Sequence, residues 1–187
     1  MTFDWVNIKD VNDAVINEFD SGEYVFNSFL KEKARLWQDI GEASTYVFAD
    51  AEEIAHKSIT RIYGYASINT MGLLYSEGDI NRYLSCAEIR MFSIASQLRK
   101  RHDPTIHWSE IIFKVLLQNL YCMSTSVIGF HAVFLNANNN GYKLYVDCGF
   151  QEIDDYVIPQ DDEKLDISEC TPLLLIIDDN ALYKMFE

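Results

Sequence analysis

The sequence predicts an α/β fold of the mixed-sheet (α+β) type, in which helices flank a central β-sheet with parallel and antiparallel strands. Two observations lead to this class. Runs of β-branched and aromatic residues alternate with apolar residues at helical spacing, and a strand–helix–strand unit follows strands that succeed one another directly. With 187 residues, the chain is long enough for one domain with a full core. We therefore expect a single domain over residues 1–187, built on six to seven strands.

The predicted elements follow from local patterns. Asp20 and Glu23 have capping-box spacing before apolar residues at helical intervals, and Gly41 suits the C-terminal cap of that helix. The stretch from Trp108 to Ser124 is apolar over much of its circumference, which is typical of a central helix. In chain order we expect a helix over 19–41, a strand over 44–50, a hairpin turn over 49–58, strands over 59–74 and 87–98, a helix over 108–124, and strands over 127–136, 150–158 and 172–177.

Charge is the strongest compositional feature of the chain. The formal net charge is −14 at pH 7, so the protein repels phosphate backbones at long range, and nucleic acid is a poor candidate partner. Amines or a basic protein fit this charge better. No apolar run nears the length of a membrane span, and the N-terminus lacks the basic and apolar regions of a signal peptide. We therefore expect a cytoplasmic protein without a membrane segment.

Metal chemistry has little support in the sequence. The cysteines at positions 86, 122, 148 and 170 are far apart, and no Cys or His spacing suggests a zinc site. The four histidines are also scattered. We therefore expect reduced, buried thiols and no bound metal ion.

The segment NNNGYKLYVDCGF, residues 138–150, places amides and a glycine before a short helix and a second glycine after it. Its motif positions are Asn138, Gly141, Leu144, Tyr145, Gly149 and Phe150. With the strands on either side, this segment resembles the C-terminal half of the GNAT superfamily of N-acetyltransferases. The asparagine can cap the helix, and the glycine at its end can supply a left-handed turn before the phenylalanine packs.

A second motif lies in the N-terminal half. FDSGEYVFNSFLKEKA, residues 19–34, is followed by GEASTYVFAD, residues 41–50, and by IYGYASI, residues 62–68. This order resembles the GNAT proteins that act as toxins in toxin–antitoxin pairs. The resemblance covers roughly residues 18–177.

The resemblance implies acetyl-CoA as cosubstrate and assigns roles to single residues. Tyr145 would be the general acid that protonates the departing thiolate of coenzyme A, and Asn138 would reach the pantetheine arm. A phenol has an ordinary pKa of about 10, so it holds its proton at neutral pH. Tyr142, one helical turn earlier, is a rival for this role. The alternative is that Tyr145 is one more core tyrosine.

The resemblance also places the acetyl carbonyl where two adjacent parallel strands splay apart. A backbone N–H near Ser93 or Ile94 would there act as an oxyanion hole. Glu88, on the same predicted strand, is a candidate general base for the incoming ammonium, with Glu110 and the loop histidines as weaker candidates. Each of these groups is otherwise a structural or surface residue.

The pyrophosphate loop departs from the family pattern. The family has an Arg/Gln-x-x-Gly-x-Gly/Ala loop, whereas PTIHWS, residues 104–109, contains no glycine. If coenzyme A is still bound, its phosphates would meet the cations Arg99, Lys100 and Arg101, the hydroxyls of Thr105 and Ser109, and backbone amides near His107 and Trp108. Alternatively, this loop has lost its function, and RKRHD is a solvated charged segment.

Two hypotheses about function follow. The first is an N-acetyltransferase that moves an acetyl group from acetyl-CoA to a primary amine of a small molecule or protein, by direct attack in a ternary complex. Toxin members acetylate charged transfer RNA, and the net charge argues against that acceptor here. The second is a non-catalytic GNAT-like protein that has lost acetyl-CoA binding and acts through a partner interface or in a homodimer. Because the Tyr145 motif is retained, we expect the enzyme.

Overall fold

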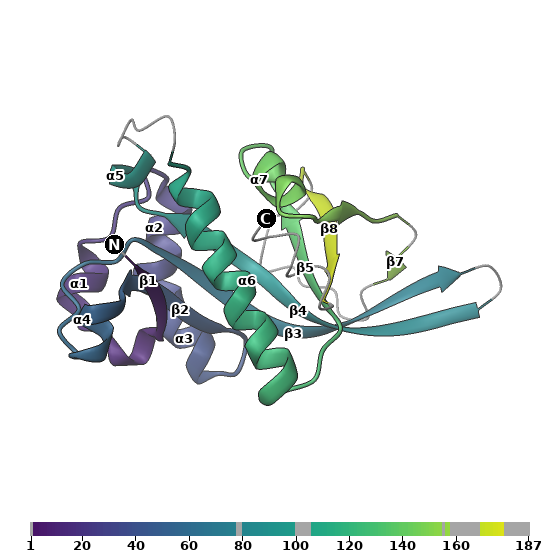
Figure 1. Ribbon diagram of the computed structural model, residues 1–187, viewed down its shortest axis with the longest axis horizontal. Coiled ribbons are helices and arrows are strands. Elements are labelled where there is room, and N and C mark those ends of the chain that lie inside the picture. Colours follow the sequence, from purple (N-terminus) through teal and green to yellow (C-terminus); the bar gives the residue numbers. More distant parts are fainter. Residues whose placement is uncertain (1, 78–79, 100–105, 155, 158–168, 178–187) are drawn as a thin grey trace. The chain divides into compact units, whose positions relative to one another are not determined.

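A computed structural model describes residues 2–77, 80–99, 106–154, 156–157 and 169–177 (Figure 1). Its elements in chain order are β1 (Phe3–Asn7), η1 (Ile8–Asp10), α1 (Asp13–Asn17), α2 (Tyr24–Ser28), η2 (Phe29–Lys33), α3 (Ala34–Asp39), β2 (Ser44–Asp50), α4 (Ala51–Ala55), β3 (Gly64–Glu77), β4 (Ile80–Ile94), α5 (Ser96–Arg99), α6 (Trp108–Ser126), β5 (Ala132–Ala137), α7 (Tyr142–Asp147), β6 (Gln151–Glu152), β7 (Tyr156–Val157) and β8 (Thr171–Ile176).

The strands form a mixed sheet, as the sequence predicts. Hydrogen bonding gives the order β1-β2-β3-β4-β5-β8-β6, and β7 pairs with β3 outside this path. The pairs β1–β2, β2–β3, β5–β8 and β6–β8 are antiparallel. The pair β4–β5 is parallel, because α6 connects these two strands as a crossover helix. The chain divides into two compact units, the first of Met1–Asn69 with Arg90–Leu116 and the second of Thr70–Ile89 with Leu117–Glu187.

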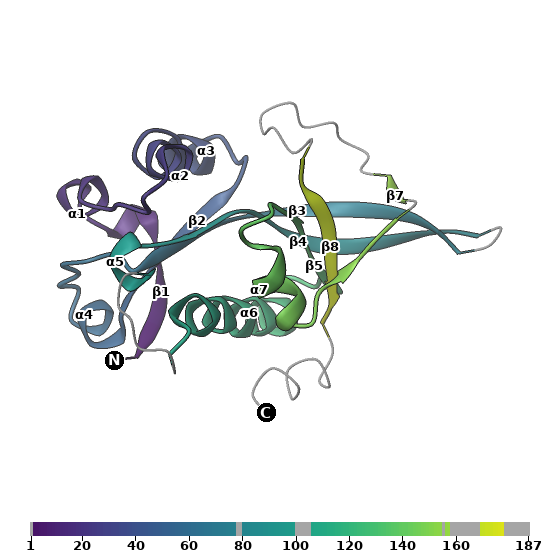
Figure 2. The same ribbon diagram turned by 90° about the horizontal axis from the view of Figure 1, so that it is seen from above.

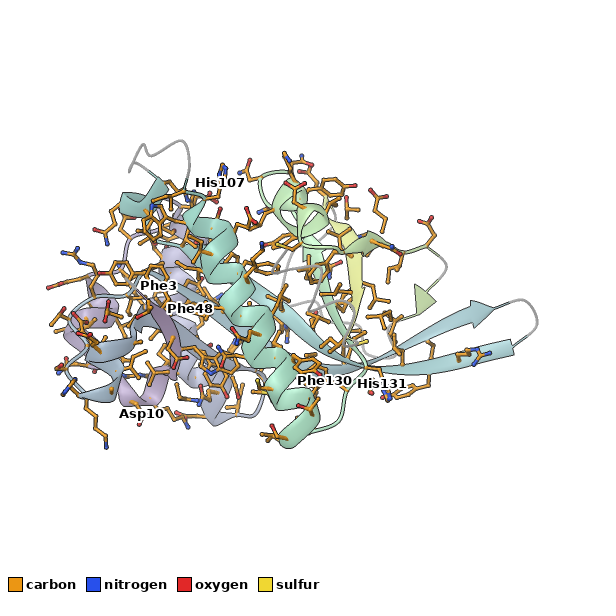
Figure 3. The ribbon with its side chains drawn as sticks, viewed as in Figure 1. Phe3, Asp10, Phe48, His107, Phe130 and His131 are labelled. Carbon is orange, nitrogen blue, oxygen red and sulfur yellow. The ribbon has the colours of Figure 1, made fainter. Side chains whose placement is uncertain are left out.

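The first unit has an aromatic core between β2 and its helices. In Figure 2, α2 and α3 lie on one side of β2 and α4 lies on the other. Phe3 and Phe48 point into this core, whereas Asp10 and His107 lie at the surface (Figure 3). Tyr65 is fully buried, its ring stacks on Phe29 with centroids 6.1 Å apart, and its hydroxyl donates to the carbonyl of residue 26 at 2.9 Å.

The second unit is built around β5. This strand pairs with β4 on one side and with β8 on the other, so the continuous apolar run AVFL is buried as expected for a central strand. Leu73, Cys86, Ala132 and Phe134 form a buried cluster. The chain then passes through α7 to β6, and α7 lies on the same side of β5 as the second half of α6 (Figure 2).

Several predicted boundaries were wrong. The strand expected over 87–98 ends at Ile94, and Ser96–Arg99 is the short helix α5. The hairpin turn expected over 49–58 contains α4, because the Asp50 carboxylate caps this helix by accepting a hydrogen bond from the amide of residue 52 at 3.0 Å. The strand expected over 150–158 is divided into β6 and β7. The expected single helix over 19–41 begins at Tyr24 and contains the π-helical turn η2.

The expectation of buried thiols holds for part of the set. Cys86 and Cys148 are buried, Cys170 is half-buried, and Cys122 is exposed, so the prediction was wrong for Cys122. Burial raises the pKa of the Cys86 thiol to about 12. Within the described residues, none of the helices combines the length and hydropathy that crossing a bilayer requires.

The buried tyrosine of the first unit predicts a loss of stability in alkali. Burial raises the pKa of Tyr65 above its ordinary value of about 10, so the unfolded chain releases a proton that the folded chain keeps. The free energy of unfolding should therefore fall as the pH rises above about 10. In Tyr65→Phe the free energy of unfolding should fall less steeply with pH than in the wild type, by up to about 1.4 kcal/mol per pH unit. Urea unfolding of both proteins between pH 8 and 11 measures the difference, and identical slopes would contradict the burial of this phenol.

Candidate active site

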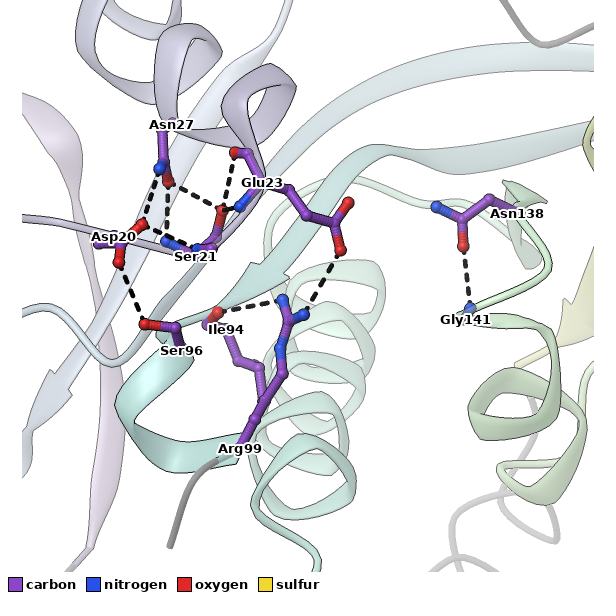
Figure 4. A network of polar contacts seen from close by, with 10 residues as sticks. Asp20, Ser21, Glu23, Asn27, Ile94, Ser96, Arg99, Asn138 and Gly141 are labelled. Atoms are coloured by element: carbon purple, nitrogen blue, oxygen red, sulfur yellow. Dashed lines mark hydrogen bonds and ion pairs between the residues drawn. The ribbon is translucent and has the colours of Figure 1, made fainter.

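The amide-rich segment before α7 forms a hydrogen-bonded turn that leads into that helix. The Asn138 side-chain Oδ1 accepts a hydrogen bond from the Gly141 amide at 2.9 Å (Figure 4), and the Asn138 carbonyl accepts from the amide of Tyr142 at 3.0 Å. These bonds satisfy amide donors of the first turn, which have no partner inside the helix. The N-cap position of α7 itself is Gly141, which has no side-chain cap, so Asn138 closes the turn before the helix rather than capping the helix as predicted. Asn138 is exposed, and its side-chain amide group is directed away from the bond to Gly141.

Tyr145 fills the space that the missing side chain of Gly141 leaves. A Cβ atom placed on Gly141 would lie 2.7 Å from Cε2 of the Tyr145 ring and 3.1 Å from its hydroxyl oxygen. The Tyr145 ring also contacts the Phe150 ring, with centroids 6.2 Å apart. Burial raises the pKa of the Tyr145 phenol above its ordinary value, and the nearby thiols of Cys148 and Cys170 raise it further. This hydroxyl therefore keeps its proton well into alkaline pH.

Tyr142, the rival of Tyr145, is engaged elsewhere. Its hydroxyl donates a hydrogen bond to the carboxylate of Glu152 in β6. This bond is the main cause of the raised pKa of Tyr142, because ionisation would place two negative charges side by side. A phenol held by a carboxylate is a poorer proton donor to a third group, so this contact counts against Tyr142 as the acid.

The glycine after α7 ends the helix as predicted. Gly149 has φ +94°, the left-handed conformation that residues with a side chain rarely adopt. The Gly149 amide donates to the Val146 carbonyl at 2.9 Å, and the Phe150 amide donates to the Tyr145 carbonyl at 3.1 Å. This pair of bonds is a Schellman motif, and it buries the Phe150 side chain directly after the turn. The backbone of Tyr145 is thus held from both ends of α7.

The candidate base lies in the parallel pair of strands. Glu88 is half-buried in β4, opposite Phe134 of β5. The register of this pair runs as far as Ile89 opposite Leu135, and each strand continues beyond that point. A parallel pair that stops while both strands go on leaves backbone groups that the ladder does not use.

Ser93 and Ile94, the candidates for the oxyanion hole, lie at the end of β4. Both are buried, and the Ser93 hydroxyl makes no hydrogen bond among the described residues. The Ser93 carbonyl lies 2.8 Å from the place of a Cβ on Gly64, so the neighbouring strand needs a glycine there. The two residues belong to the first unit, whereas Glu88, Asn138 and Tyr145 belong to the second. The proposed oxyanion-hole role of Ser93 and Ile94, in one site with Tyr145, therefore stays a prediction.

The cations expected to face the phosphates are described only in part. Arg99, at the end of α5, lies 3.4 Å from a Glu23 carboxylate oxygen and 3.5 Å from the Ile94 carbonyl (Figure 4). Both side chains of the ion pair are two-fifths exposed, so the pair is weak and Arg99 can exchange Glu23 for another anion. Lys100, Arg101 and Thr105 lie outside the described residues.

The helix α6 begins close to the predicted position. The His107 carbonyl accepts from the amide of Ile111 at 3.0 Å, so the first-turn amides, including those of Trp108 and Ser109, have no partner within the helix. The Trp108 ring meets Phe3 edge to face at 5.8 Å, and its indole N–H makes no hydrogen bond among the described residues. His107 is exposed (Figure 3). The weaker candidate base, residue 110, also lies in this turn and forms an ion pair with Lys114 at 2.9 Å.

The sequence FDSG forms a hydrogen-bonded loop that joins two segments far apart in the chain (Figure 4). The Asp20 carboxylate accepts from the amide of Gly22 and from the Asn27 side chain, both at 2.8 Å, and from the Ser96 hydroxyl at 3.2 Å. The Ser96 amide donates to the Asp20 carbonyl at 2.8 Å. Ser21 is fully buried and donates both its amide and its hydroxyl to the Asn27 side-chain oxygen. The loop is thereby fixed to α2 and to the start of α5.

This network corrects the predicted capping box. Asp20 does not bond the amide of residue 23; that amide donates to the Ser21 hydroxyl at 3.1 Å instead. Asn27 and Ser96 were not singled out from the sequence. The Asp-Ser-Gly triplet favours a turn whose side chains bond to nearby backbone, and Gly22 does adopt φ +82°, but the triplet does not indicate Asn27 or Ser96 as partners. Among the described residues, no group of His, Cys, Asp and Glu side chains is arranged to hold a metal ion.

Asp20 should contribute measurably to stability, although it lies at the surface. Replacing it by alanine removes the acceptor of three hydrogen bonds, including the link to Ser96, so Asp20→Ala should lower the free energy of unfolding by about 1–3 kcal/mol. Asp10→Ala is the matched control, because Asp10 is exposed and makes no comparable contact. Urea unfolding compares the two variants, and equal stabilities would mean that the loop does not depend on this carboxylate.

No model of a known protein family matches the chain. Solved structures, in contrast, match it over almost its full length. A tyrosine-to-phenylalanine mutant of the toxin AtaT superposes with a TM-score of 0.70 at 14% sequence identity, covering 99% of this chain and 94% of that chain. A tyrosine-to-phenylalanine mutant of KacT gives a TM-score of 0.67 at 16% identity, covering 100% and 98%. AtaT complexed with acetyl-methionyl-tRNAfMet gives 0.65 at 15% identity, covering all of both chains.

These similarities concern the fold, because the sequence identities are low. The match covers 99% of this chain, so the similarity extends over the whole fold rather than over one motif. This protein therefore has the GNAT-like fold of these toxins, as its sequence predicted.

Proposed function

We propose that this protein is an acyltransferase that moves an acetyl group from acetyl-CoA to a primary amine. The observation that carries the proposal is the construction of α7, in which Gly141 and Phe150 hold the ring of a protonated phenol, Tyr145. The fold adds support, because AtaT has been solved with acetyl-CoA bound together with the C-terminus of its antitoxin AtaR. The AtaT and KacT structures are also of mutants that lack one tyrosine hydroxyl, which is the change that would disable a phenolic acid.

The reaction is a direct transfer in a ternary complex. The amine attacks the thioester carbonyl carbon, the new C–N bond forms, and the C–S bond breaks. The Tyr145 hydroxyl donates its proton to the departing sulfur, and the raised pKa of the phenol keeps that proton available throughout the neutral range. Glu88 accepts the proton that the attacking ammonium loses, directly or through water. No covalent intermediate with the protein is needed.

Other residues would hold the cosubstrate. The exposed side chain of Asn138, with its capping oxygen already bonded to Gly141, can donate through its amide group to the pantetheine arm. Backbone N–H groups near Ser93 or Ile94 would stabilise the oxyanion. The phosphates would meet Arg99, Lys100, Arg101, Thr105, Ser109 and the amides near His107 and Trp108, in place of a glycine-rich loop.

The acceptor is a small-molecule or protein amine in this proposal. A net charge of −14 favours cationic acceptors and disfavours an RNA footprint, although AtaT itself has been solved with acetyl-methionyl-tRNAfMet and the KacTA complex with DNA. We place the reaction in the cytoplasm and treat residues 1–187 as one functional domain. Association with an antitoxin or as a homodimer is compatible with the fold.

A second function has one observation in its favour. Two carboxylates lie next to the groups proposed to bind the phosphates of coenzyme A. Glu23 pairs with Arg99, and Glu110 lies in the first turn of α6. Such groups repel a pyrophosphate. A non-catalytic GNAT-like protein that has lost acetyl-CoA binding would show this arrangement. Calorimetry with acetyl-CoA separates the two functions, since micromolar binding supports the enzyme and undetectable binding supports the alternative.

Removal of the Tyr145 hydroxyl tests the proposed acid. In Tyr145→Phe, coenzyme A release with a panel of polyamines, amino acids and lysine peptides should fall about 100-fold or more. The dissociation constant for acetyl-CoA should change less than about twofold, because a phenylalanine ring fills the same space. Tyr142→Phe is the control and should keep most of its activity. If Tyr145→Phe retained its turnover while Tyr142→Phe lost it, the roles would be reversed.

Gly141 should be required for the same step through the position of the Tyr145 ring. Gly141→Ala places a methyl group within 2.7 Å of that ring, so the ring turns out of its place. We expect turnover to fall at least tenfold with the dissociation constant for acetyl-CoA nearly unchanged. Gly129→Ala is the matched control, because a Cβ at Gly129 meets no atom within 4 Å. Equal activity of the two alanine variants would show that the ring position is irrelevant to catalysis.

A further inference from the structure

A cavity in the first unit lies outside the residues assigned to acetyl transfer. Its volume is about 290 Å³, near the lower end of small-molecule sites, which favours a small metabolite over a nucleotide. It is formed where the end of α1, the segment before β3 and the start of α5 meet. The lining residues are Val15, Glu18, Phe19, Asp20, Thr60, Arg61, Ile62, Ala95, Ser96 and Gln97.

The cavity has an apolar floor and fixed walls. Phe19, Ile62 and Ala95 are each at most 3% exposed, so they belong to the core as well as to the cavity. One wall is held by the hydrogen bonds between Asp20 and Ser96. The lining segment before β3 is fixed by residue 60, whose amide and hydroxyl both donate hydrogen bonds to the carboxylate of residue 53, at 2.8 and 2.7 Å. A site with such walls needs little ordering when a ligand enters.

The rim carries charges of both signs. Arg61 and Glu18 are exposed, and neither side chain forms an ion pair or hydrogen bond with the described part of the chain. The Asp20 carboxylate differs, because its two oxygens already accept three hydrogen bonds. One guanidinium and one carboxylate thus border a cavity with a mixed polar and apolar lining, and neither side chain has a partner among the described residues. A ligand that satisfies both groups has a cation and an anion.

We propose that this cavity binds a small zwitterion of the α-amino acid type with an aliphatic side chain. Its carboxylate pairs with the Arg61 guanidinium, which offers a planar fork of N–H donors to such a group. Its ammonium pairs with Glu18, and its side chain covers the floor of Phe19, Ile62 and Ala95. A phosphorylated ligand fits less well, since Glu18 and Asp20 give the lining a net negative charge. None of the residues that line this cavity is assigned a role in acetyl transfer.

The test is calorimetric titration of the full chain with L-leucine, without acetyl-CoA. Isocaproate, which lacks the ammonium, and isoamylamine, which lacks the carboxylate, serve as ligands that keep the aliphatic part. The variants are Arg61→Gln and Glu18→Gln. Lys31→Gln and Asp10→Asn are the controls, since each removes a like charge from an exposed position of the same unit that does not line the cavity. All four positions are exposed, so thermal unfolding should confirm that each variant folds.

The expected result is that L-leucine binds with a dissociation constant in the millimolar range or below. Each cavity variant should weaken this binding about tenfold or more, as the loss of one charge-assisted hydrogen bond does, and neither control should. Each analogue should bind more weakly than L-leucine. The proposal is overturned if L-leucine gives no binding at millimolar concentration, or if its affinity is the same in Arg61→Gln and Glu18→Gln as in the wild type.

Discussion

The packing of one aromatic ring against a bare backbone position is the contact on which the proposed chemistry depends. Tyr145 lies where the side chain of residue 141 would be, and the Schellman motif at Gly149 fixes the other end of the same helix. A short helix of six residues is not stable by itself. The turn closed by Asn138, the terminal glycine and the buried Phe150 therefore hold the helix and its phenol in place.

The fold and the α7 motif were predictable because their determinants are local. A glycine at a left-handed position, an asparagine cap and a long apolar helix each leave a pattern within a few residues, and α6, α7 and β2 were found where the patterns indicate. The strand β1 was not predicted. It is five residues long and depends on pairing with β2, and a contact 39 residues or more along the chain has no local signature.

The candidate site was predictable to a smaller extent. The sequence indicated Tyr145 and Asn138, whose roles stay predictions, and the structure gives the turn bond of Asn138 and the packing of the Tyr145 ring. It did not indicate that Glu152 engages Tyr142, or that Ser96 completes the FDSG loop, because both partners come from other parts of the chain. The absence of glycines before α6 was visible, but the substitute for the missing phosphate loop depends on Lys100, Arg101 and Thr105, which lie outside the described residues.

Charge connects these observations. A strongly acidic chain that binds an anionic cosubstrate needs local cations or N–H donors for its phosphates, and the first turn of α6 and Arg99 are described groups of that kind.

The most direct measurement is a crystal structure of the wild-type protein with acetyl-CoA. The proposed function predicts the Tyr145 hydroxyl within hydrogen-bond distance of the thioester sulfur. A bound acetyl-CoA whose sulfur lies far from this hydroxyl would contradict it.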